Sequence, residues 1–351
     1  MTEYKRIAID TSKAVFTLHG IDQTERPVLR VNLGRAQMIS FFKKLPPTEI
    51  AIEACGGSHH WGRALSTLGH RVLLIPPQYV KPFVKRSKND RNDAAAICEA
   101  AGRPGMHFVP VKSADQQAQG MVLKVREALV DQRTALVNTL RGHAAEFGVT
   151  AGKGVSNVIP LLEKIAAEIT IPLEARTTMA LLGEEIDRLD ARLKHLATKL
   201  NQAHKANPVS VRLATIPGVG PIIALALATE IDPTAFESGR HLAAWAGLTP
   251  REHSTGGKQH MGEISRAGNE RLRALLVLGA TSVPRNEGPR AWIKVAERPG
   301  NKLATEWLLK LLRRRPRKVA AVALANKMAR IAWAIMMSGE TYRRAPAAGV
   351  S

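Results

Sequence analysis

The 351-residue chain is poor in cysteine, in acidic residues and in long apolar runs. Its two cysteines, Cys55 and Cys98, exclude a disulfide-stapled scaffold and favour a reducing compartment. The first residues lack the pattern of a signal peptide, so we expect a cytoplasmic protein. The longest apolar stretches, 219–229 and 319–337, are too short or too charged to predict a membrane span, and no membrane partner is expected.

The scarcity of acids leaves a large positive charge. The chain has 51 basic and 30 acidic residues, a formal charge of +21. The net charge is +7 in residues 1–110, +2 in 111–205 and +12 in 206–351. Such a charge most often indicates a polyanionic partner, with nucleic acid as the first candidate. Two basic ends around a near-neutral middle predict two nucleic-acid-facing domains joined by a part with another role.

The first part of the chain, 1–150, alternates strand and helix patterns. Three successive strands are expected at 4–10, 14–20 and 27–33. Helix, strand, helix and strand then follow at 36–45, 49–53, 60–68 and 72–75, and a long helix at 114–147. This order predicts an α/β domain with a mixed sheet.

The middle part, 151–206, has the clearest helical periodicity. Its apolar residues are spaced three and four apart, and the remaining positions are nearly all charged or polar. This pattern predicts a coiled coil through which two chains form a homodimer. A helix that packs on its own domain is the alternative. The residues of the seam are Met179, Leu182, Ile186, Leu189, Leu193, Leu196 and Leu200.

The last part, 207–345, is predicted to be mostly α-helical. The segment Pro217-Gly218-Val219-Gly220 between two apolar stretches is typical of a helix-hairpin-helix turn. Gly218 and Gly220 would let the backbone approach a phosphate, although such a turn between core helices needs no ligand. Residues 247–268, rich in isolated glycines, predict a loop among helices.

Two further features of this part, its tryptophans and a basic run, can be explained without a specific function. Trp292, Trp307 and Trp333 lie at helical spacing among apolar neighbours, so we expect them in the core rather than as stacking platforms. The densest basic run, 312–318, is either a solvated surface or a contact with phosphates that does not read sequence.

Four acids of the basic N-terminal part have unusual places. Asp10 and Glu53 each end an apolar strand and should emerge at the edge of the sheet. Asp90 and Asp93 lie three residues apart at the start of a helix, on one face, where the helix dipole also favours them. Clustered carboxylates repel one another unless a cation lies between them. In a phosphate-binding protein, they predict a Mg²⁺ site.

Three motifs surround these acids, and four other motifs occur in the C-terminal part. They are Ala8-Ile9-Asp10-Thr11-Ser12-Lys13, Glu53-Ala54-Cys55-Gly56-Gly57-Ser58, Lys88-Asn89-Asp90-Arg91-Asn92-Asp93-Ala94, Ile216-Pro217-Gly218-Val219-Gly220, Gly247-Leu248-Thr249-Pro250-Arg251, Ser254-Thr255-Gly256-Gly257-Lys258 and Ile264-Ser265-Arg266-Ala267-Gly268-Asn269. In this combination the chain resembles, over nearly its whole length, the insertion sequence 110 family of transposases, with Asp10, Glu53, Asp90 and Asp93 as its DEDD tetrad.

The resemblance implies a RuvC-like N-terminal domain with the RNase H fold, a helical coiled-coil segment and a mostly α-helical C-terminal transposase domain with a helix-hairpin-helix. It implies a recombinase that moves its own insertion sequence, guided by an element-encoded noncoding RNA that pairs with donor and target DNA. The four acids would hold Mg²⁺, and a C-terminal serine would attack a DNA phosphate to form a covalent intermediate. The two halves of each site would come from different protomers, as a homodimer that forms a tetramer on DNA.

Three hydroxyls could be this nucleophile. Ser254 fits the motif best, because the glycines that follow let DNA approach. Thr255 falls where some relatives have serine, and Ser265 also resembles the N-cap of a helix that begins near Gly268. The nearby cations Arg251, Lys258 and Arg266 could neutralise the attacked phosphate. His253 is not expected to be the base, because neighbouring side chains point apart.

Two other functions remain open at this point. A metal-dependent RuvC-like nuclease or junction resolvase would use the acids without serine chemistry. A non-catalytic DNA-binding protein would need neither the acids nor the serine, and the four placed acids argue against it.

Overall fold

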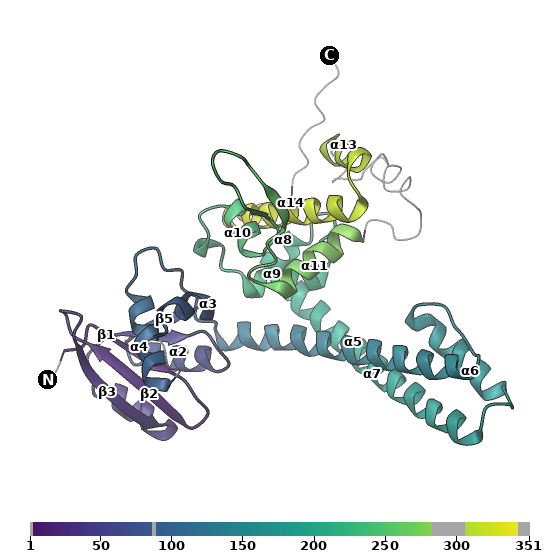
Figure 1. The fold of residues 1–351 in the computed structure, drawn as a ribbon, viewed down its shortest axis with the longest axis horizontal. Coiled ribbons are helices and arrows are strands. Elements are labelled where there is room, and N and C mark those ends of the chain that lie inside the picture. Colours follow the sequence, from purple (N-terminus) through teal and green to yellow (C-terminus); the bar gives the residue numbers. More distant parts are fainter. Residues whose placement is uncertain (1–2, 86–88, 283–305, 343–351) are drawn as a thin grey trace, which may run out of the picture. The chain divides into compact units, whose positions relative to one another are not determined.

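The computed structural model describes residues 3–85, 89–282 and 306–342 (Figure 1). It contains two compact units, Met1–Gln117 and Ala118–Ser351. The division at residues 150 and 206 that the sequence suggests stays a prediction about domains.

The first unit is built on a five-stranded mixed sheet in the order β3-β2-β1-β4-β5. The strands β1, β2 and β3 pair antiparallel, whereas β1, β4 and β5 pair parallel. The strands are β1 (Arg6–Asp10), β2 (Val15–Ile21), β3 (Pro27–Gly34), β4 (Glu49–Glu53) and β5 (Arg71–Ile75). The predicted mixed α/β sheet is therefore confirmed, with strand ends within two residues of those expected.

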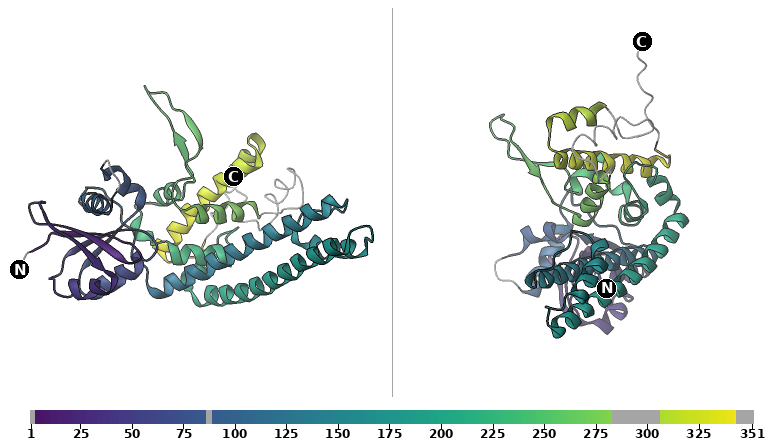
Figure 2. Two further views of the ribbon diagram at one scale, coloured as in Figure 1. Left: turned by 60° about the horizontal axis from the view of Figure 1, so that its bottom comes forward. Right: turned by 90° about the vertical axis from the view of Figure 1, so that its right-hand side faces the viewer.

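Helices cover both faces of this sheet (Figures 1 and 2). Ile7 and Ile9 of β1 lie in a core with α1 (Met38–Phe42) and α2 (Ser58–Thr67). Ala8, on the other face, lies in a second core with α3 (Pro77–Val80) and α4 (Asp90–Ala101). Since side chains alternate along a strand, Asp10 belongs to the face that α4 covers.

The second unit begins with a long helical hairpin. Helix α5 (Ala114–Glu146) and helix α7 (Leu173–Ala206) run antiparallel, with α6 (Val158–Ala167) between them in the chain (Figures 1 and 2). Arg133 of α5 forms an ion pair with Asp190 of α7. The long helix expected at 114–147 is confirmed.

The apolar seam of α7 is buried within the chain. Met179 and Ile186 share a core with α5 and α6, and Leu200 shares another with Leu123 of α5. Leu189 and Leu193 are also buried. The prediction that this seam forms a homodimer is therefore wrong for the seam itself. The periodicity of a helix cannot tell whether its apolar stripe meets another copy or its own chain, and here it meets its own.

The remaining helices form one core around α14 (Arg317–Ser338), which packs against α10 (Gly239–Trp245) and α11 (Glu270–Thr281). By length and hydropathy α14 could cross a membrane, but residues such as Leu324 and Met328 are buried in this core. The other helices of the unit are α8 (Pro208–Leu213), α9 (Pro221–Glu230) and α13 (Glu306–Arg314).

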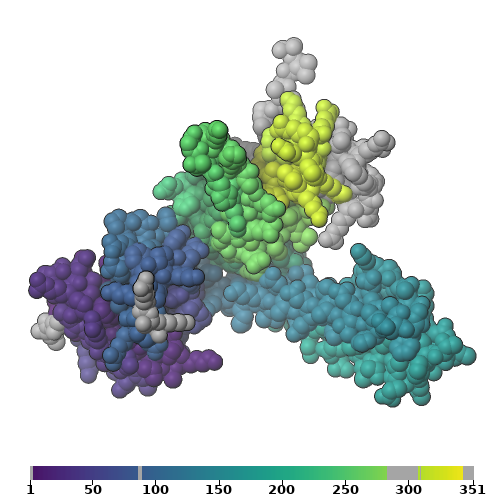
Figure 3. Space-filling view, in the orientation of Figure 1, coloured from purple at the N-terminus to yellow at the C-terminus, as the bar shows by residue number. Residues whose placement is uncertain are grey.

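A two-stranded antiparallel hairpin, β6 (Pro250–Glu252) and β7 (Met261–Ile264), projects from these helices (Figures 2 and 3). The sequence predicted a loop here, and this prediction is wrong. Almost all of its residues are exposed, so no apolar alternation marks the strands. We call residues 250–264 the ribbon.

The tryptophans are only partly as expected. Trp333 is partly buried, and its indole N–H donates to the carbonyl of Pro233 (3.0 Å). Trp307 is 40% exposed, with the Lys327 ammonium 5.1 Å from its ring centroid, so its assignment to the core is wrong. Trp292 lies outside the described residues.

Candidate functional site

The first candidate site is formed by carboxylates at the carboxyl ends of β1 and β4. These strands are parallel neighbours, with Ile9 paired to Ile52, so Asp10 and Glu53 follow at adjacent positions on the α4 face. The small residues Ala8 and Ala51 precede them and are fully buried beneath α4. The strand pairing and the small side chains together bring the start of α4 close to both strand ends.

Helix α4 supplies the other two acids. Its N-cap is Asn89, whose side chain accepts a hydrogen bond from the backbone N–H of Asn92 (2.9 Å). Asp90 and Asp93 therefore lie in the first turn. Carboxylate oxygens of Asp10, Asp90 and Asp93 lie within 4.8 Å of one another. All four predicted acids are thus in the same region, three of them in one cluster.

The electrostatics of the cluster are those of a cation site. Desolvation by burial, and then the charges of Asp93, Asp90 and Glu53, raise the pKa of Asp10 to about 6. Burial, followed by the charge of Asp93, also raises the pKa of Glu53. Because the neighbouring carboxylates oppose one another's ionisation, a bound cation would stabilise their charged forms. Such an all-oxygen donor set fits a hard divalent ion.

The second candidate site is the ribbon of the second unit. At its tip Thr255 and Lys258 exchange both backbone hydrogen bonds, and Gly256 and Gly257 have φ angles of +56° and +77°. Two residues with positive φ make the type I′ turn that joins antiparallel strands, and glycine adopts it without strain. The Gly-Gly pair was the signal in the sequence that could have predicted the hairpin.

Ser254 lies beside this turn and is exposed. Its hydroxyl donates to Oε1 of Glu252 (2.6 Å) and accepts from the backbone N–H of His260 (3.3 Å). The sequence analysis missed Glu252, because residues two apart share a side only in a strand and the segment was expected to be a loop.

The other two hydroxyls have different surroundings. Thr255 belongs to the turn itself. Ser265 lies at the base of the ribbon, where its hydroxyl accepts from the N–H of Ala267 (3.5 Å). The helix that follows is capped by Asn269, whose side chain accepts from the N–H of Leu272 (2.9 Å). The prediction that Ser265 is the N-cap is therefore wrong.

The predicted cations of the ribbon differ in how they are held. The Arg251 guanidinium donates to the carbonyl of Ser265 (3.3 and 3.1 Å), across the two strands. Arg266 forms an ion pair with Glu263 (3.1 Å). Lys258 is exposed at the tip. Of the three, Lys258 is best placed to meet a phosphate.

The base of the ribbon is clamped to the helical core. Gly268 has a φ angle of +69°, and a Cβ there would lie 1.7 Å from the carbonyl oxygen of Trp245. The largely buried Arg273 donates to the carbonyls of Ala246 (3.1 Å) and Ala267 (3.0 Å), one on each side of the ribbon. The sequence analysis missed Arg273, since nothing in the sequence distinguishes a buried arginine from the many exposed ones.

The predicted helix-hairpin-helix glycines occupy the turn between α8 and α9. Gly218 has a φ angle of +84°, and a Cβ there would lie 2.9 Å from the carbonyl oxygen of Gly279 in α11. Glycine is therefore required for packing at this position. Gly220 is the N-cap of α9, and a Cβ there would meet nothing within 4 Å. Only Gly220 leaves room for a ligand.

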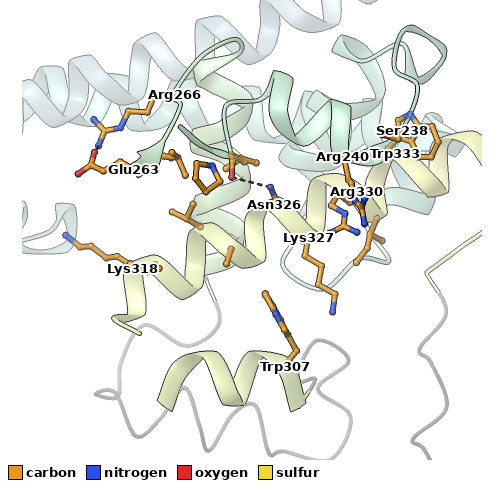
Figure 4. A pocket seen from close by; sticks show the side chains of 18 of the residues that line it. Ser238, Arg240, Glu263, Arg266, Trp307, Lys318, Asn326, Lys327, Arg330 and Trp333 are labelled. Atoms are coloured by element: carbon orange, nitrogen blue, oxygen red, sulfur yellow. Dashed lines mark hydrogen bonds and ion pairs between the residues drawn. The ribbon is translucent and has the colours of Figure 1, made fainter. Parts of the chain in front are cut away.

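A groove of about 1490 Å³ lies beside the base of the ribbon, lined by α10, α14 and Trp307 (Figure 4). Its floor is apolar, with Val319, Val322 and Ile331 of α14. Basic residues outnumber acidic ones among its lining side chains. The charged residues are Arg240, Glu263, Arg266, Lys318, Lys327 and Arg330.

Comparisons with known proteins agree with this description. A DEDD-type transposase model matches residues 7–148, and the model described as "Transposase IS116/IS110/IS902 family" matches residues 210–292. The chain is 52% identical over 341 residues to the protein y4pF/y4sB of Sinorhizobium fredii, which is named as a transposase (97% of this chain, 86% of that protein). It is 39% identical over 346 residues to the transposase for insertion sequence element IS1111A of Coxiella burnetii (98% and 92%).

The mixed sheet and its acids thus define a DEDD-type transposase, an enzyme that cuts and rejoins DNA and whose class implies a divalent metal. The chain belongs to the IS110 family of insertion-sequence transposases. The non-catalytic alternative is thereby set aside.

Proposed function

We propose that the protein is an RNA-guided DNA recombinase that uses Mg²⁺ at Asp10, Glu53, Asp90 and Asp93 and Ser254 as its nucleophile. The observation that carries the proposal is the cluster of Asp10, Asp90 and Asp93 oxygens within 4.8 Å of one another. The strand order, with one antiparallel and one parallel half, supports assigning a RuvC-like RNase H fold to the first unit.

In this proposal the residues of the chain divide the work. The four carboxylates hold Mg²⁺, which when bound supplies positive charge to the phosphate oxygens. Ser254 attacks the phosphorus of the scissile phosphate and forms a covalent phosphoserine link to one DNA end, while the bond from phosphorus to the deoxyribose oxygen of the other end breaks and that oxygen leaves as a hydroxyl. Lys258 neutralises the phosphate near the tip of the ribbon, with Arg251 and Arg266 as further cations if DNA displaces their present partners. Gly220 leaves the start of α9 open to a backbone phosphate.

The partners follow from the same proposal. Donor and target DNA, and the element-encoded noncoding RNA, meet the two basic ends of the chain. The basic residues around the groove are a candidate contact with phosphates. We place the enzyme in the bacterial cytoplasm, with the chromosome as its substrate.

A strand-transfer assay with the element's RNA, matched donor and target DNA and Mg²⁺ tests the chemistry. Wild type should give a protein–DNA adduct that resists denaturant and requires both RNA and metal. Ser254→Ala and Asp10→Asn should each lower adduct formation by at least about 10³-fold. Thr255→Ala, Ser265→Ala and Asp115→Asn are the matched controls. Cleavage without an adduct, unchanged by Ser254→Ala, would indicate the metal-dependent nuclease instead.

The resemblance to IS110 transposases implies that the acids and the serine of each site come from different chains, and we propose the same of this protein. The contact between chains must use a surface other than the buried seam of α7. Mixing Asp10→Asn with Ser254→Ala tests this. If the halves come from different chains, the mixture should recover part of the activity that each variant lacks; a mixture as inactive as its components would show that each chain supplies both halves.

A further inference from the structure

The hydrogen bond between Ser254 and Glu252 distinguishes one hydroxyl from its two competitors. Ser254 Oγ donates to Glu252 Oε1 at 2.6 Å, the range of a charge-assisted bond. Among the described residues, Thr255 and Ser265 have no recorded hydrogen bond to a carboxylate. Both members of the pair are exposed on the ribbon, where DNA can reach them.

The backbone of the ribbon sets the positions of the Glu252 and Ser254 side chains relative to each other. Glu252 is the last residue of β6, and Ser254 follows two residues later, between that strand and the turn. The backbone N–H of His253 donates to the carbonyl of His260 (2.9 Å), so the two arms of the ribbon are paired at this point. Positions two apart in a strand lie on one side, and intervening side chains on the other. Arg251 accordingly reaches across to the carbonyl of Ser265. The clamp at the base of the ribbon then fixes the orientation of both strands.

We propose that Glu252 is the general base that activates Ser254. This proposal rests on the proposed function, in which Ser254 is the nucleophile. As Ser254 Oγ bonds to phosphorus, its proton passes to Oε1 of Glu252, and the bond from phosphorus to one deoxyribose oxygen breaks. That oxygen leaves with its electron pair and takes a proton from water. The N–H of His260 stays directed at Oγ and stabilises the charge that develops on it.

The proposed proton transfer accounts for the Glu252 carboxylate close to where a DNA phosphate would bind. A carboxylate beside a phosphate is repelled, and protonation by Ser254 removes that repulsion as the reaction proceeds. The ammonium of Lys258, exposed beside the turn, is available to the same phosphate. The other ionisable groups of the ribbon are Arg251, His253, Lys258, His260 and Glu263.

The test compares Glu252→Gln with Glu163→Gln, a matched substitution of an exposed glutamate of α6 that belongs to neither site. Single-turnover rates of adduct formation would be measured at neutral pH, and DNA affinity by fluorescence anisotropy. Glu252→Gln should lower the rate roughly 10²- to 10⁴-fold and keep DNA affinity within about threefold. Glu163→Gln should keep the rate, and Glu252→Asp, which keeps a carboxylate, should react at an intermediate rate.

The outcomes separate this proposal from the one on which it rests. An adduct that survives Ser254→Ala would overturn both. An adduct lost in Ser254→Ala but formed at the wild-type rate by Glu252→Gln would overturn the role of Glu252 alone. A loss of rate in Glu252→Gln that is fully matched by lost DNA affinity would also overturn it, because Glu252 would then act in binding only.

Discussion

The acidic site and the ribbon differ in how the fold holds their side chains in place. Asp10 and Glu53 follow strands that are buried on both faces, and the capped start of α4 adds Asp90 and Asp93 to them. Ser254 lies near the tip of a ribbon that is exposed along its length and fixed only at its base. The hydrophobic core of the first unit positions the acids, whereas hydrogen bonds and close packing at the base of the ribbon position Ser254.

This difference has an electrostatic consequence. Packing forces the carboxylates together and raises the pKa of Asp10 and Glu53, so the folded state is strained electrostatically until a cation binds. The hydroxyl of Ser254 is neutral, and the chain itself supplies its partners. The acidic site therefore depends on a ligand, whereas the ribbon depends on its attachment, and the two should respond to different substitutions.

The largest effect should come from the base of the ribbon. Gly268→Ala places a Cβ against the carbonyl of Trp245 at a positive φ angle, so we expect it to lower the free energy of unfolding of the second unit by roughly 3 kcal/mol or more. Gly257→Ala, at the tip, has a positive φ angle but open space, and should cost only about 1 kcal/mol. Urea unfolding of both variants measures the difference. Equal effects would show that the base is no more constrained than the tip.

The next effect concerns metal affinity. Asp10→Asn removes a charge from the cluster, so the affinity for Mg²⁺ should fall at least about tenfold. Ser254→Ala should leave this affinity unchanged, because it removes no charge from the cluster. Isothermal titration calorimetry with each variant provides the comparison. Unchanged binding by Asp10→Asn would remove Asp10 from the metal site.

The sequence predicted the positions of the four acids on their strands and helix because the signals are local. The strands that end at Asp10 and Glu53 are short apolar runs, and Asn89 marks the start of α4 at Asp90. Each acid could therefore be placed on its element without knowing what packs against it. The same patterns predicted a mixed sheet with antiparallel and parallel strands.

The ribbon and the seam of α7 were misjudged for a physical reason. The ribbon has no buried face, so its strands lack the alternation that reveals most strands, and only Gly256 and Gly257 indicated it. The seam has strong periodicity, but burial against α5 leaves the same pattern as burial against a second chain. Local patterns define elements, whereas partners depend on the tertiary structure.

A smaller effect tests the strain at the acidic site. Without metal, the pKa of Asp10 in the folded protein is about 6, above its ordinary 3.8, so the folded state keeps a proton that the unfolded state releases between these values. Stability should therefore fall as pH rises from about 4 to 6 and stay low above it. Asp10→Asn should raise the free energy of unfolding of the metal-free protein at pH 7 by on the order of 1 kcal/mol, after allowance for solvent screening.

Thermal unfolding without metal, at pH 4 and pH 7, measures this gain. It should shrink at pH 4, where Asp10 is protonated, and again at pH 7 with saturating Mg²⁺, which stabilises only the wild-type cluster. A gain that is the same under all three conditions would mean that Asp10→Asn acts through packing rather than charge.

The smallest effect is expected at the tip of the ribbon. Lys258 is exposed beside Ser254 and has no ion pair recorded among the described residues, so its charge is available to a DNA phosphate. Each such contact releases about 0.9 of a counterion, so Lys258→Ala should make the negative slope of log affinity against log salt less steep by about 0.9. Lys258→Arg, which keeps the charge, should leave the slope unchanged. Fluorescence anisotropy titrations over a salt series measure it, and an unchanged slope in Lys258→Ala would show that the tip does not contact the DNA backbone.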